Sequence, residues 1–262
     1  MFEALAIGAT GMQAQQLSVE TIANNLANVN TVGFKKGRVG FSDLMLQENA
    51  RMSPAGADDM RTSAVQRSAA GVGITSVNRI FDSGELKKTD VPLDLAIRGD
   101  GFLEVTLADG TSAYTRGGSL KINKDGLLAT QAGLPLCPAI TLPDTAESIT
   151  IGADGGVLVR TAGRSAAIEA GHLELVRFAN PAQLAAQGDN LYRATEASGE
   201  ARAVHPGEEG AGMFAQGFVE ASNVKMVDEM VNLMLAQRAY EASVKVVQAA
   251  DEMLGMVNNL RK

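Results

Sequence analysis

Apolar residues recur every seven positions near the start of the chain. Two interleaved series share this spacing: Leu5, Met12, Val19 and Leu26 in one, and Gly8, Gln15, Ile22 and Val29 in the other. A seven-residue repeat is typical of a coiled-coil seam, so the series predicts a helix over residues 3–29 with an imperfect seam. The helix would be roughly 40 Å long. Because Gly8 and Gly11 weaken its early turns, we expect this helix to need a partner to be ordered.

A second long helix is predicted at the end of the chain, where either Ser222 or Asn223 can accept backbone N–H groups as the N-cap. Its apolar residues form two stripes: Met226, Leu233, Tyr240, Val247 and Leu254 in one, and Val246, Ala250, Met253, Val257 and Leu260 in the other. A helix that is apolar over such a wide arc must be buried from more than one direction. The pattern leaves two arrangements open: the terminal helices pair and close one domain, or the pair also packs against neighbouring subunits.

The middle of the chain is predicted to be rich in β-strands. Short strand-like runs such as DLAIRG, GFLEVTL, SAYTR and VLVRT are separated by turn residues, and Asp109-Gly110, Asp125-Gly126 and Asp154-Gly155 stand where hairpins would turn. Residues 46–73 are polar, small and weakly periodic, which indicates a long loop or extended arm. The predicted fold class is α+β. It has N- and C-terminal helices (1–32 and 222–262) paired in a coiled-coil-like domain, an arm or linker (33–75), and a central β-rich domain with hairpins (76–221).

Composition and charge exclude several classes of partner. The chain has 262 residues, of which 45% are hydrophobic, as in a folded protein. Its formal net charge of -7 argues against binding to nucleic acid or to anionic membranes. Lys35, Lys36 and Arg38 form the one dense basic cluster near the start, and we interpret it as a solvated loop. No apolar run is long enough to span a membrane, and the N-terminus lacks the pattern of a secretory signal.

Residues that often carry chemistry are few and scattered. Cys137 lies in the apolar run GLPLCPAI and is predicted to be a small buried hydrophobic residue. His172 and His205 are the only histidines, and they lack the spacing of metal ligands or of a catalytic set. Glu208 and Glu209 beside His205 are interpreted as part of a solvated loop. We therefore expect no enzymatic activity, no metal and no cofactor.

An asparagine cluster interrupts the end of the first predicted helix. Asn24, Asn25, Asn28 and Asn30 lie in VETIANNLANVNTVGFKKGR (residues 19–38). Together they lower the local helix preference by about 2 kcal/mol relative to alanine, so other interactions must hold this segment. One hypothesis is that Asn24, Asn25 and Asn28 hydrogen-bond across a subunit interface, while Gly33 permits a turn and Phe34 anchors it. The alternative is a frayed helix end that is rich in C-cap residues.

The segment ANNLANVNTVGFK (residues 23–35) resembles the N-terminal signature of the bacterial flagellar rod and hook family. The segment GFVEASNVKMVDEMVNLMLAQRAYE (residues 217–241) resembles the C-terminal signature of the same family, and the middle of the chain is similar to its distal-rod branch. The resemblance implies that both termini form an inner coiled-coil layer around a central channel and that the β-rich domain lies outside. It also implies helical polymerisation, because a head-to-tail contact whose rotation does not close makes a filament.

The resemblance further implies a place and a set of partners. The place is the flagellar basal body, from periplasm to outer membrane, reached through the export apparatus without a cleaved signal peptide. The partners are other copies of the chain, proximal rod proteins, the hook protein, the surrounding P and L ring proteins and the flagellar export apparatus, with no nucleic acid and no membrane insertion. By analogy with distal rods, the arm around residues 46–65 is expected to make the polymer straight.

Pattern and resemblance together predict an assembly interface on the terminal segments. Its candidate residues are Leu5, Met12, Val19, Ile22, Asn24, Asn25, Leu26, Asn28, Gly33, Phe34, Asn223, Met226, Met230, Leu233, Gln237, Arg238, Tyr240, Glu241, Val247 and Leu254. Two alternatives to a distal-rod subunit stay open at this point. One is a proximal-rod or hook protein of the same family, and the other is a soluble β-domain module that binds a ligand.

Overall fold

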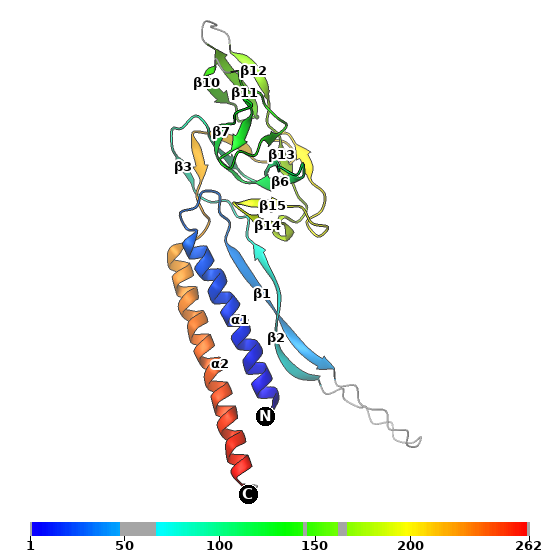
Figure 1. Cartoon of the computed structure of the whole chain (residues 1–262), viewed down its shortest axis with the longest axis vertical. Coiled ribbons are helices and arrows are strands. Elements are labelled where there is room, and N and C mark those ends of the chain that lie inside the picture. The colour runs from blue at the N-terminus through cyan, green and yellow to red at the C-terminus, as the bar shows by residue number, and fades with distance from the viewer. Residues whose placement is uncertain (1, 48–66, 144–145, 162–166, 261–262) are drawn as a thin grey trace, which may run out of the picture. The chain divides into compact units, whose positions relative to one another are not determined.

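The computed structural model describes residues 2–47, 67–143, 146–161 and 167–260 (Figure 1). The chain divides into two compact units. The helical unit comprises Met1–Asn24, Arg38–Asn78 and Val227–Lys262, and the β-rich unit comprises Asn25–Gly37 and Arg79–Met226. The chain therefore passes from one unit to the other at four points: 24/25, 37/38, 78/79 and 226/227. The mixture of long helices and a β-rich region confirms the α+β class.

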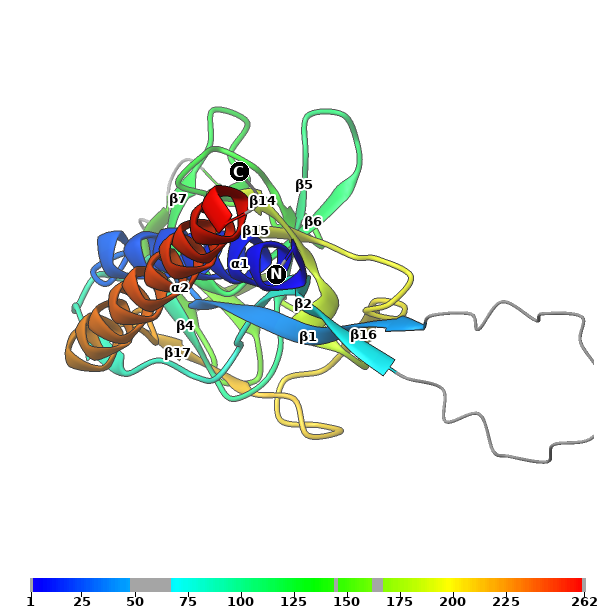
Figure 2. The ribbon, with the colours of Figure 1, turned by 90° about the horizontal axis from the view of Figure 1, so that it is seen from below.

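Both predicted terminal helices are present. Helix α1 spans Phe2–Ala27 and helix α2 spans Met226–Leu260. Within the helical unit the two helices run side by side (Figures 1 and 2). They approach each other closely at two glycines: a Cβ atom placed on Gly8 would lie 2.6 Å from Cγ2 of Val247, and one on Gly11 would lie 3.5 Å from Oγ of Ser243. The two glycines weaken the isolated helix, but they let a second helix come close.

Burial follows a heptad-like spacing on both helices. The α1 positions that are buried or half-buried at intervals of three and four are Gly8, Gly11, Gln15, Ser18, Ile22 and Asn25. On α2 the same spacing gives Glu229, Leu233 and Ala236 and then, beyond the exposed Tyr240, Ser243, Val247, Ala250 and Leu254. This spacing keeps one stripe of each helix covered, with a break on α2 at Tyr240.

The predicted N-cap of α2 is wrong. The helix begins at Met226. The Ser222 hydroxyl accepts the N–H of Val224 at 3.3 Å, and Oδ1 of Asn223 accepts the N–H of Lys36 at 2.8 Å. Both side chains therefore serve the segment that precedes the helix, and Asn223 is bonded to a residue far away in the sequence.

Two long strands pair within the arm region. Strand β1 spans Gly37–Gln47 and strand β2 spans Arg67–Arg79, and they form a two-stranded sheet. The ribbon follows α1 (Figures 1 and 2), and the N–H of Val72 donates to Oγ1 of Thr10 at 3.3 Å. Residues 46–73 were interpreted as a long loop or extended arm, and the loop is wrong for 46–47 and 67–73, which belong to β1 and β2. The prediction that residues 46–65 make the polymer straight stays a prediction, because residues 48–65 lie outside the described residues.

The β-rich unit is built from short antiparallel strands. They are β3 (Leu86–Lys88), β4 (Asp94–Arg98), β5 (Leu103–Thr106), β6 (Ser112–Thr115), β7 (Gly117–Ile122), β8 (Leu128–Thr130), β9 (Leu136–Cys137), β10 (Ala146–Ile151), β11 (Gly156–Thr161), β12 (Ile168–His172), β13 (Leu175–Arg177), β14 (Ala185–Gly188), β15 (Leu191–Arg193), β16 (Arg202–Val204), β17 (Met213–Gln216) and β18 (Phe218–Glu220). A short 3-10 helix, η1, spans Pro181–Gln183. The strand orders are β17-β4-β7-β8, β14-β15-β6-β5-β9, β10-β11-β12, β13-β16 and β18-β3.

The three predicted Asp-Gly hairpin turns are confirmed. Asp109-Gly110 joins β5 to β6, Asp125-Gly126 joins β7 to β8, and Asp154-Gly155 joins β10 to β11, and each pair of strands is antiparallel. The glycines at these turns have φ between +72° and +93°, a region that is costly for residues with a Cβ atom.

Two side-chain clusters fill the β-rich unit. The larger is aliphatic and includes Leu95, Ile97, Leu103, Val105 and Val157. The smaller is aromatic, and its rings meet edge to face: Phe81, Phe102, Tyr114, Phe178 and Tyr192. Such ring pairs add stability beyond the area that they bury. Both clusters give the unit a packed interior of its own.

Cys137 was predicted to be buried, and this is wrong, because its side chain is exposed. It belongs to the two-residue strand β9, in which Leu136 points into the core. Side chains alternate between the two faces of a strand, so the neighbour of a buried leucine faces water.

Candidate assembly surface and buried polar junction

The segment that follows α1 turns sharply and is anchored in the β-rich unit. Gly33 has φ +70° and donates its N–H to the carbonyl of Glu220 at 2.7 Å. Phe34 is buried, and the guanidinium carbon of Arg79 lies 5.0 Å from the centre of its ring. The expected turn at Gly33 and anchor at Phe34 are therefore present within one chain.

Asn25 provides part of the answer to the asparagine cluster. Its side chain is only 2% exposed. Nδ2 donates to the carbonyl of Gly37 at 2.9 Å, and Oδ1 accepts the N–H of Gly37 at 2.8 Å. The amide thus pairs with both backbone groups of one residue, as a neighbouring strand would. A leucine or alanine at this position would leave these backbone groups without this partner, at a cost of about 1–3 kcal/mol each.

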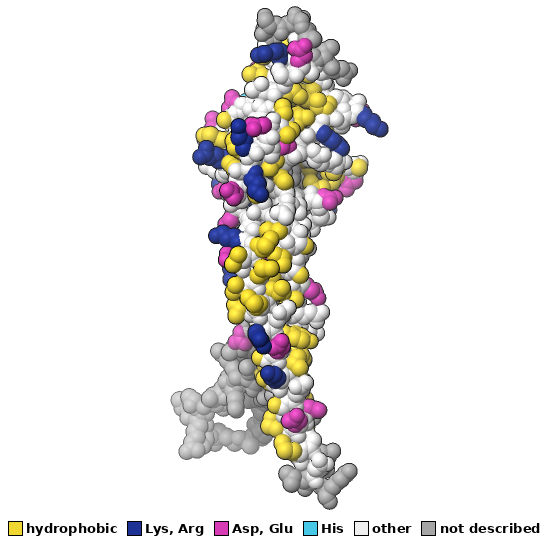
Figure 3. Space-filling model, turned by 90° about the vertical axis from the view of Figure 1, so that its left-hand side faces the viewer, with side chains coloured by type: hydrophobic (Ala, Val, Ile, Leu, Met, Phe, Trp, Pro, Cys, Tyr) yellow, Lys and Arg dark blue, Asp and Glu magenta, His cyan; other side chains and the backbone are white. Residues whose placement is uncertain are grey.

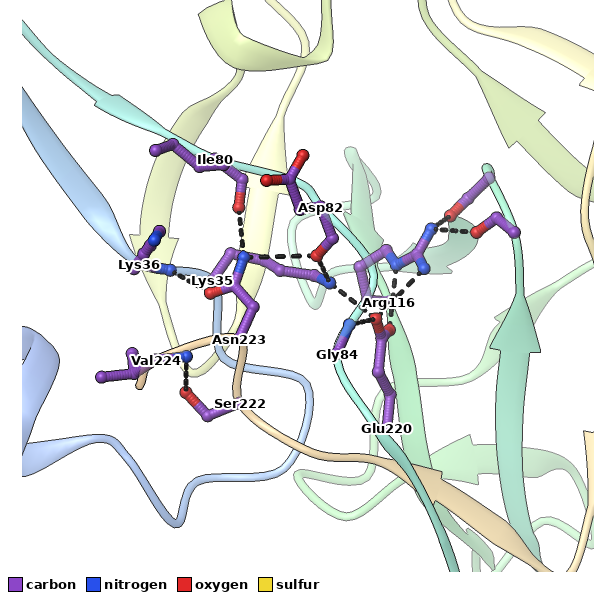
Figure 4. A network of polar contacts seen from close by, with 12 residues as sticks. Lys35, Lys36, Ile80, Asp82, Gly84, Arg116, Glu220, Ser222, Asn223 and Val224 are labelled. Atoms are coloured by element: carbon purple, nitrogen blue, oxygen red, sulfur yellow. Dashed lines mark hydrogen bonds and ion pairs between the residues drawn. The ribbon is translucent and has the colours of Figure 1, made fainter. Parts of the chain in front are cut away.

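Asn223 makes a second set of backbone contacts. Its Oδ1 accepts the N–H of Lys36, and its Nδ2 donates to the carbonyls of Ile80 at 2.8 Å and Asp82 at 3.2 Å. Its own N–H donates to the carbonyl of Phe34 at 3.3 Å. One asparagine therefore joins three segments that are distant in the sequence (Figure 4).

A buried ion network lies in the same region (Figure 4). Nζ of Lys35 is 2.6 Å from Oε1 of Glu220, and Nε of Arg116 is 3.1 Å from Oε2 of Glu220. The side chains of Lys35, Glu220 and Arg116 are 0%, 1% and 2% exposed. The interpretation of the basic cluster as a solvated loop is therefore wrong for Lys35. Its counter-charge stands 185 positions later, where a local sequence pattern cannot reveal it.

Further donors and acceptors complete this network. Lys35 also donates to the carbonyl of Asp82 at 2.7 Å. Arg116 donates from Nη1 to the carbonyls of Gly99 at 2.9 Å and Gly101 at 2.8 Å. Oε1 of Glu220 accepts the N–H of Gly84 at 2.7 Å. Buried charges are tolerated when they are paired and hydrogen-bonded in this way.

The network shifts the pKa values of its members. Burial alone would raise the pKa of Glu220, but the charges of Arg116 and Lys35 outweigh it and hold this pKa below its ordinary value of 4.5. Burial, together with the charge of Arg116, holds the pKa of Lys35 below its ordinary value of 10.5 in spite of Glu220. Two cations share one carboxylate, so Glu220 is the member on which the other two depend.

A wide apolar surface lies on α2. It consists of large side chains in the first turns, which we call the α2 apolar face: Met226, Val227, Met230, Val231, Met234 and Leu235. Val227 is 72% exposed and Leu235 is 63% exposed. Residues four apart lie on the same side of a helix, so 226/230/234 and 227/231/235 form two adjacent rows. In Figure 3 hydrophobic side chains gather along the helix. Tyr240, Val246, Met253 and Met256 extend this exposure toward the C-terminus.

The predicted interface residues separate into two groups by burial. The exposed members are Asn24, Met226, Met230, Gln237, Arg238, Tyr240 and Glu241. The buried or half-buried members are Leu5, Met12, Val19, Ile22, Asn25, Leu26, Asn28, Gly33, Phe34, Asn223, Leu233, Val247 and Leu254. Val227, Val231, Met234 and Leu235 are exposed but were absent from the prediction. The wide apolar arc of the predicted helix was the sequence signal by which these four residues could have been found.

The described residues offer little catalytic chemistry. Among them, no group of three or more His, Cys, Asp or Glu side chains is placed to hold a metal ion. The rings of His172 and His205 lie 6.1 Å apart. A groove of about 650 Å³ passes Val32, Gly118, Thr130 and Asn190, and Asp189 is the one ionisable side chain in its lining. No helix in the described ranges is both long enough and apolar enough to cross a membrane.

Comparison with known proteins identifies the class first. Residues 96–159 match the model of the flagellar hook protein FlgE/F/G D1 domain. Residues 215–260 match the flagellar basal body rod FlgEFG protein C-terminal model, and residues 5–35 match the flagella basal body rod protein model. The chain is thus similar to axial structural proteins of the bacterial flagellum over its terminal helices and its β-rich region.

Full-length relatives narrow the class. The flagellar basal-body rod protein FlgG of Borreliella burgdorferi is 44% identical over 100% of both chains. FlgG of Caulobacter vibrioides is 44% identical over 99% of both chains, and the rod protein FlgF of the same organism is 35% identical over 98% of this chain and 100% of its own. The chain belongs to the family of flagellar basal-body rod proteins. This family is structural and not enzymatic.

Proposed function

We propose that this chain is a distal-rod subunit, which assembles helically with copies of itself into the rigid shaft that transmits torque from motor to hook. The observation that carries the proposal is the α2 apolar face. Soluble monomers rarely expose a large contiguous apolar patch, and such patches mark interaction sites. Burying the exposed part of each side chain would contribute roughly 1 kcal/mol, because full burial of a Val, Leu or Met contributes about 1.5–3 kcal/mol.

In the assembled rod, residues 1–32 and 222–262 would form the inner layer as a coiled-coil-like pair, residues 33–75 the arm, and residues 76–221 the outer domain. The close approach at Gly8 and Gly11 supports a paired arrangement of the helices. The exposed group of the predicted interface residues would contact neighbouring copies directly. The buried group would hold the shape of the surface that they form.

Two rod proteins of a single organism favour a distal position, because the chain is more similar to FlgG, the distal-rod protein, than to FlgF. The chain is 44% identical to FlgG of Caulobacter vibrioides and 35% identical to FlgF of the same bacterium. We infer that its neighbours along the axis are proximal rod proteins and the hook protein, that P and L ring proteins surround it, and that it reaches the basal body through the flagellar export apparatus without a cleaved signal peptide. In this proposal the rod extends from the periplasm to the outer membrane.

The test replaces two members of the α2 apolar face. A Val227→Gln and Leu235→Gln double variant keeps side chains of similar size but makes them polar. The control is Ile122→Gln on β7 of the β-rich unit, where the native side chain is 43% exposed. A strain that lacks the native gene would carry each variant, and basal bodies would be counted by electron microscopy. We expect the double variant to arrest at the rod stage and the control to swim.

The purified double variant should unfold at the same urea concentration as the native chain, because the replaced side chains are solvated in the monomer. Complete rods in the strain with the double variant would refute the proposed surface. A gold-labelled copy found only at the proximal end of the rod would refute the distal assignment. A ligand-binding module would instead show saturable binding of a small molecule by the purified chain.

A further inference from the structure

All four passages of the chain between the units meet in one hydrogen-bonded region of the β-rich unit. We call this region the polar junction and define it by Asn25, Lys35, Arg116, Glu220 and Asn223. The passages at 24/25 and 37/38 are joined because the Asn25 amide pairs with both backbone groups of Gly37. The Asn25 amide thereby holds the chain entering the unit at residue 25 next to the chain leaving it at residue 37.

The passage at 78/79 is joined to the same place. The N–H of Ile80 donates to the carbonyl of Lys36 at 3.0 Å, and Nη1 of Arg79 donates to the carbonyl of Lys35 at 2.7 Å. The passage at 226/227 is joined through Asn223, which is bonded to Lys36, Ile80 and Asp82. Each passage is thus hydrogen-bonded to another within a few residues of the point where the chain leaves the unit.

The junction is fixed to the sheets by its charges. Glu220 belongs to β18. Arg116 lies between β6 and β7 in the sequence and donates to the carbonyls of Gly99 and Gly101, which directly follow β4. Lys35 lies in the segment Asn25–Gly37, between the first two passages, and its ammonium group contacts Glu220. Bonds between charged groups in a dry interior are stronger than the same bonds in water. A pull on any passage therefore reaches the sheets through several bonds at once.

We propose that the polar junction is the mechanical coupling of the subunit, in which Asn25 and Asn223 are positioning residues that make the four passages share any force applied to one of them. The proposal rests on the torque-carrying role inferred above, since a shaft must pass force between the parts of each subunit. It assigns to Asn25 and Asn223 a task within one chain, independent of any contact between subunits.

The test pulls single molecules of the full chain between a cysteine introduced by Ala23→Cys, an exposed position directly before the first passage, and Cys137, the one cysteine of the sequence, which is exposed on β9, so that most of α1 lies outside the loaded segment. Force then enters the β-rich unit at residue 25. In the native chain we expect no extension before the unit itself unfolds. In Asn25→Ala and Asn223→Ala we expect an early step of about 30 Å, because the ten residues 25–34 reach at most ~3.5 Å each when they peel away.

Two controls separate coupling from general stability. Asn123→Ala removes an asparagine of the β7–β8 turn, whose Oδ1 accepts the N–H groups of Asp125 and Leu127, so it weakens the unit at a distance from the passages. The second control pulls between Cys137 and a cysteine introduced by Glu196→Cys, so that the force stays inside the β-rich unit. The early step should be absent in both controls. Its presence in either control, or its absence from both junction variants, would overturn the proposal.

A measurement on the native chain covers the case in which the variants do not fold. Hydrogen exchange should show that the amides of Lys36, Gly37, Ile80 and Asn223 open together, with one protection factor within about threefold. Exchange of Gly37 at least tenfold faster than Ile80 would show independent passages and overturn the coupling. Because these experiments use the monomer, a negative result would overturn the coupling and leave the distal-rod assignment untouched. Conversely, if the isolated chain showed the coupling but basal bodies contained no rod made of it, only the distal-rod assignment would fail.

Discussion

Glu220 should matter more for stability than Lys35, although the two form one ion pair. Replacement of Lys35 by Met removes one of two cations and leaves Glu220 bonded to Arg116 and to the N–H of Gly84. The carbonyl of Asp82 loses one donor but keeps Nδ2 of Asn223. Replacement of Glu220 by Gln leaves Lys35 and Arg116 facing each other without a carboxylate.

The magnitudes follow from these two outcomes. Removal of one partner of a buried ion pair costs about 3–5 kcal/mol when the remaining charge has no compensation. This situation applies to Glu220→Gln, so we expect about 3–5 kcal/mol of lost unfolding free energy. In Lys35→Met the remaining charges stay balanced, and the cost reduces to lost hydrogen bonds of about 1.5–3 kcal/mol.

The assay is urea unfolding of the purified chain at pH 7, followed by the near-ultraviolet circular dichroism of tyrosine. Tyr114 and Tyr192 lie in the aromatic cluster of the β-rich unit, so this signal reports the unit that holds the network. An unchanged dependence of the free energy on urea would show that the variants alter stability and not the extent of unfolding. A Lys35→Met variant that loses as much stability as Glu220→Gln, or more, would refute the reasoning.

Three further predictions concern pH and glycine. The contribution of Glu220 should be complete above its ordinary pKa of 4.5 and be lost as pH falls through its lower pKa in the folded chain, so urea unfolding should show the gap between native chain and Glu220→Gln closing in acid. Gly33→Ala should lose about 1–2 kcal/mol in the same assay, because φ is +70° there; no loss would contradict the turn. Gly8→Ala should reduce rod formation, since its methyl group meets Val247, and Val247→Ala should restore it in the double variant, as counted in basal bodies.

Much of the fold was predictable because the relevant patterns are local. Seven-residue repeats gave the terminal helices, and Asp-Gly pairs gave three hairpins, since each depends on a few adjacent residues. The direction of single side chains was less predictable. The apolar run around Cys137 does not show which of its residues faces the core, because that depends on the register of β9 against β5.

The junction was the part that local patterns could not reveal. Lys35 has the sequence neighbourhood of a solvated cation, and only Glu220, far along the chain, makes its burial tolerable. Asn223 has the sequence position of a helix N-cap, and its actual partners are Lys36, Ile80 and Asp82. In both cases the residue type shows that the side chain can form an ion pair or hydrogen bonds, but its partners are determined by the tertiary structure.

This dependence has a consequence for how the subunit forms. The two segments that identify the family, residues 23–35 and 217–241, supply the opposite charges and the two asparagines of the junction. A chain of which only one of these segments is available would bury Lys35 without Glu220, or Glu220 without Lys35, and an unpaired buried charge is strongly unfavourable. The segment that follows α1 therefore gains its native position only when residues near both ends of the chain are present together, so we expect the junction to order late, once both segments are available.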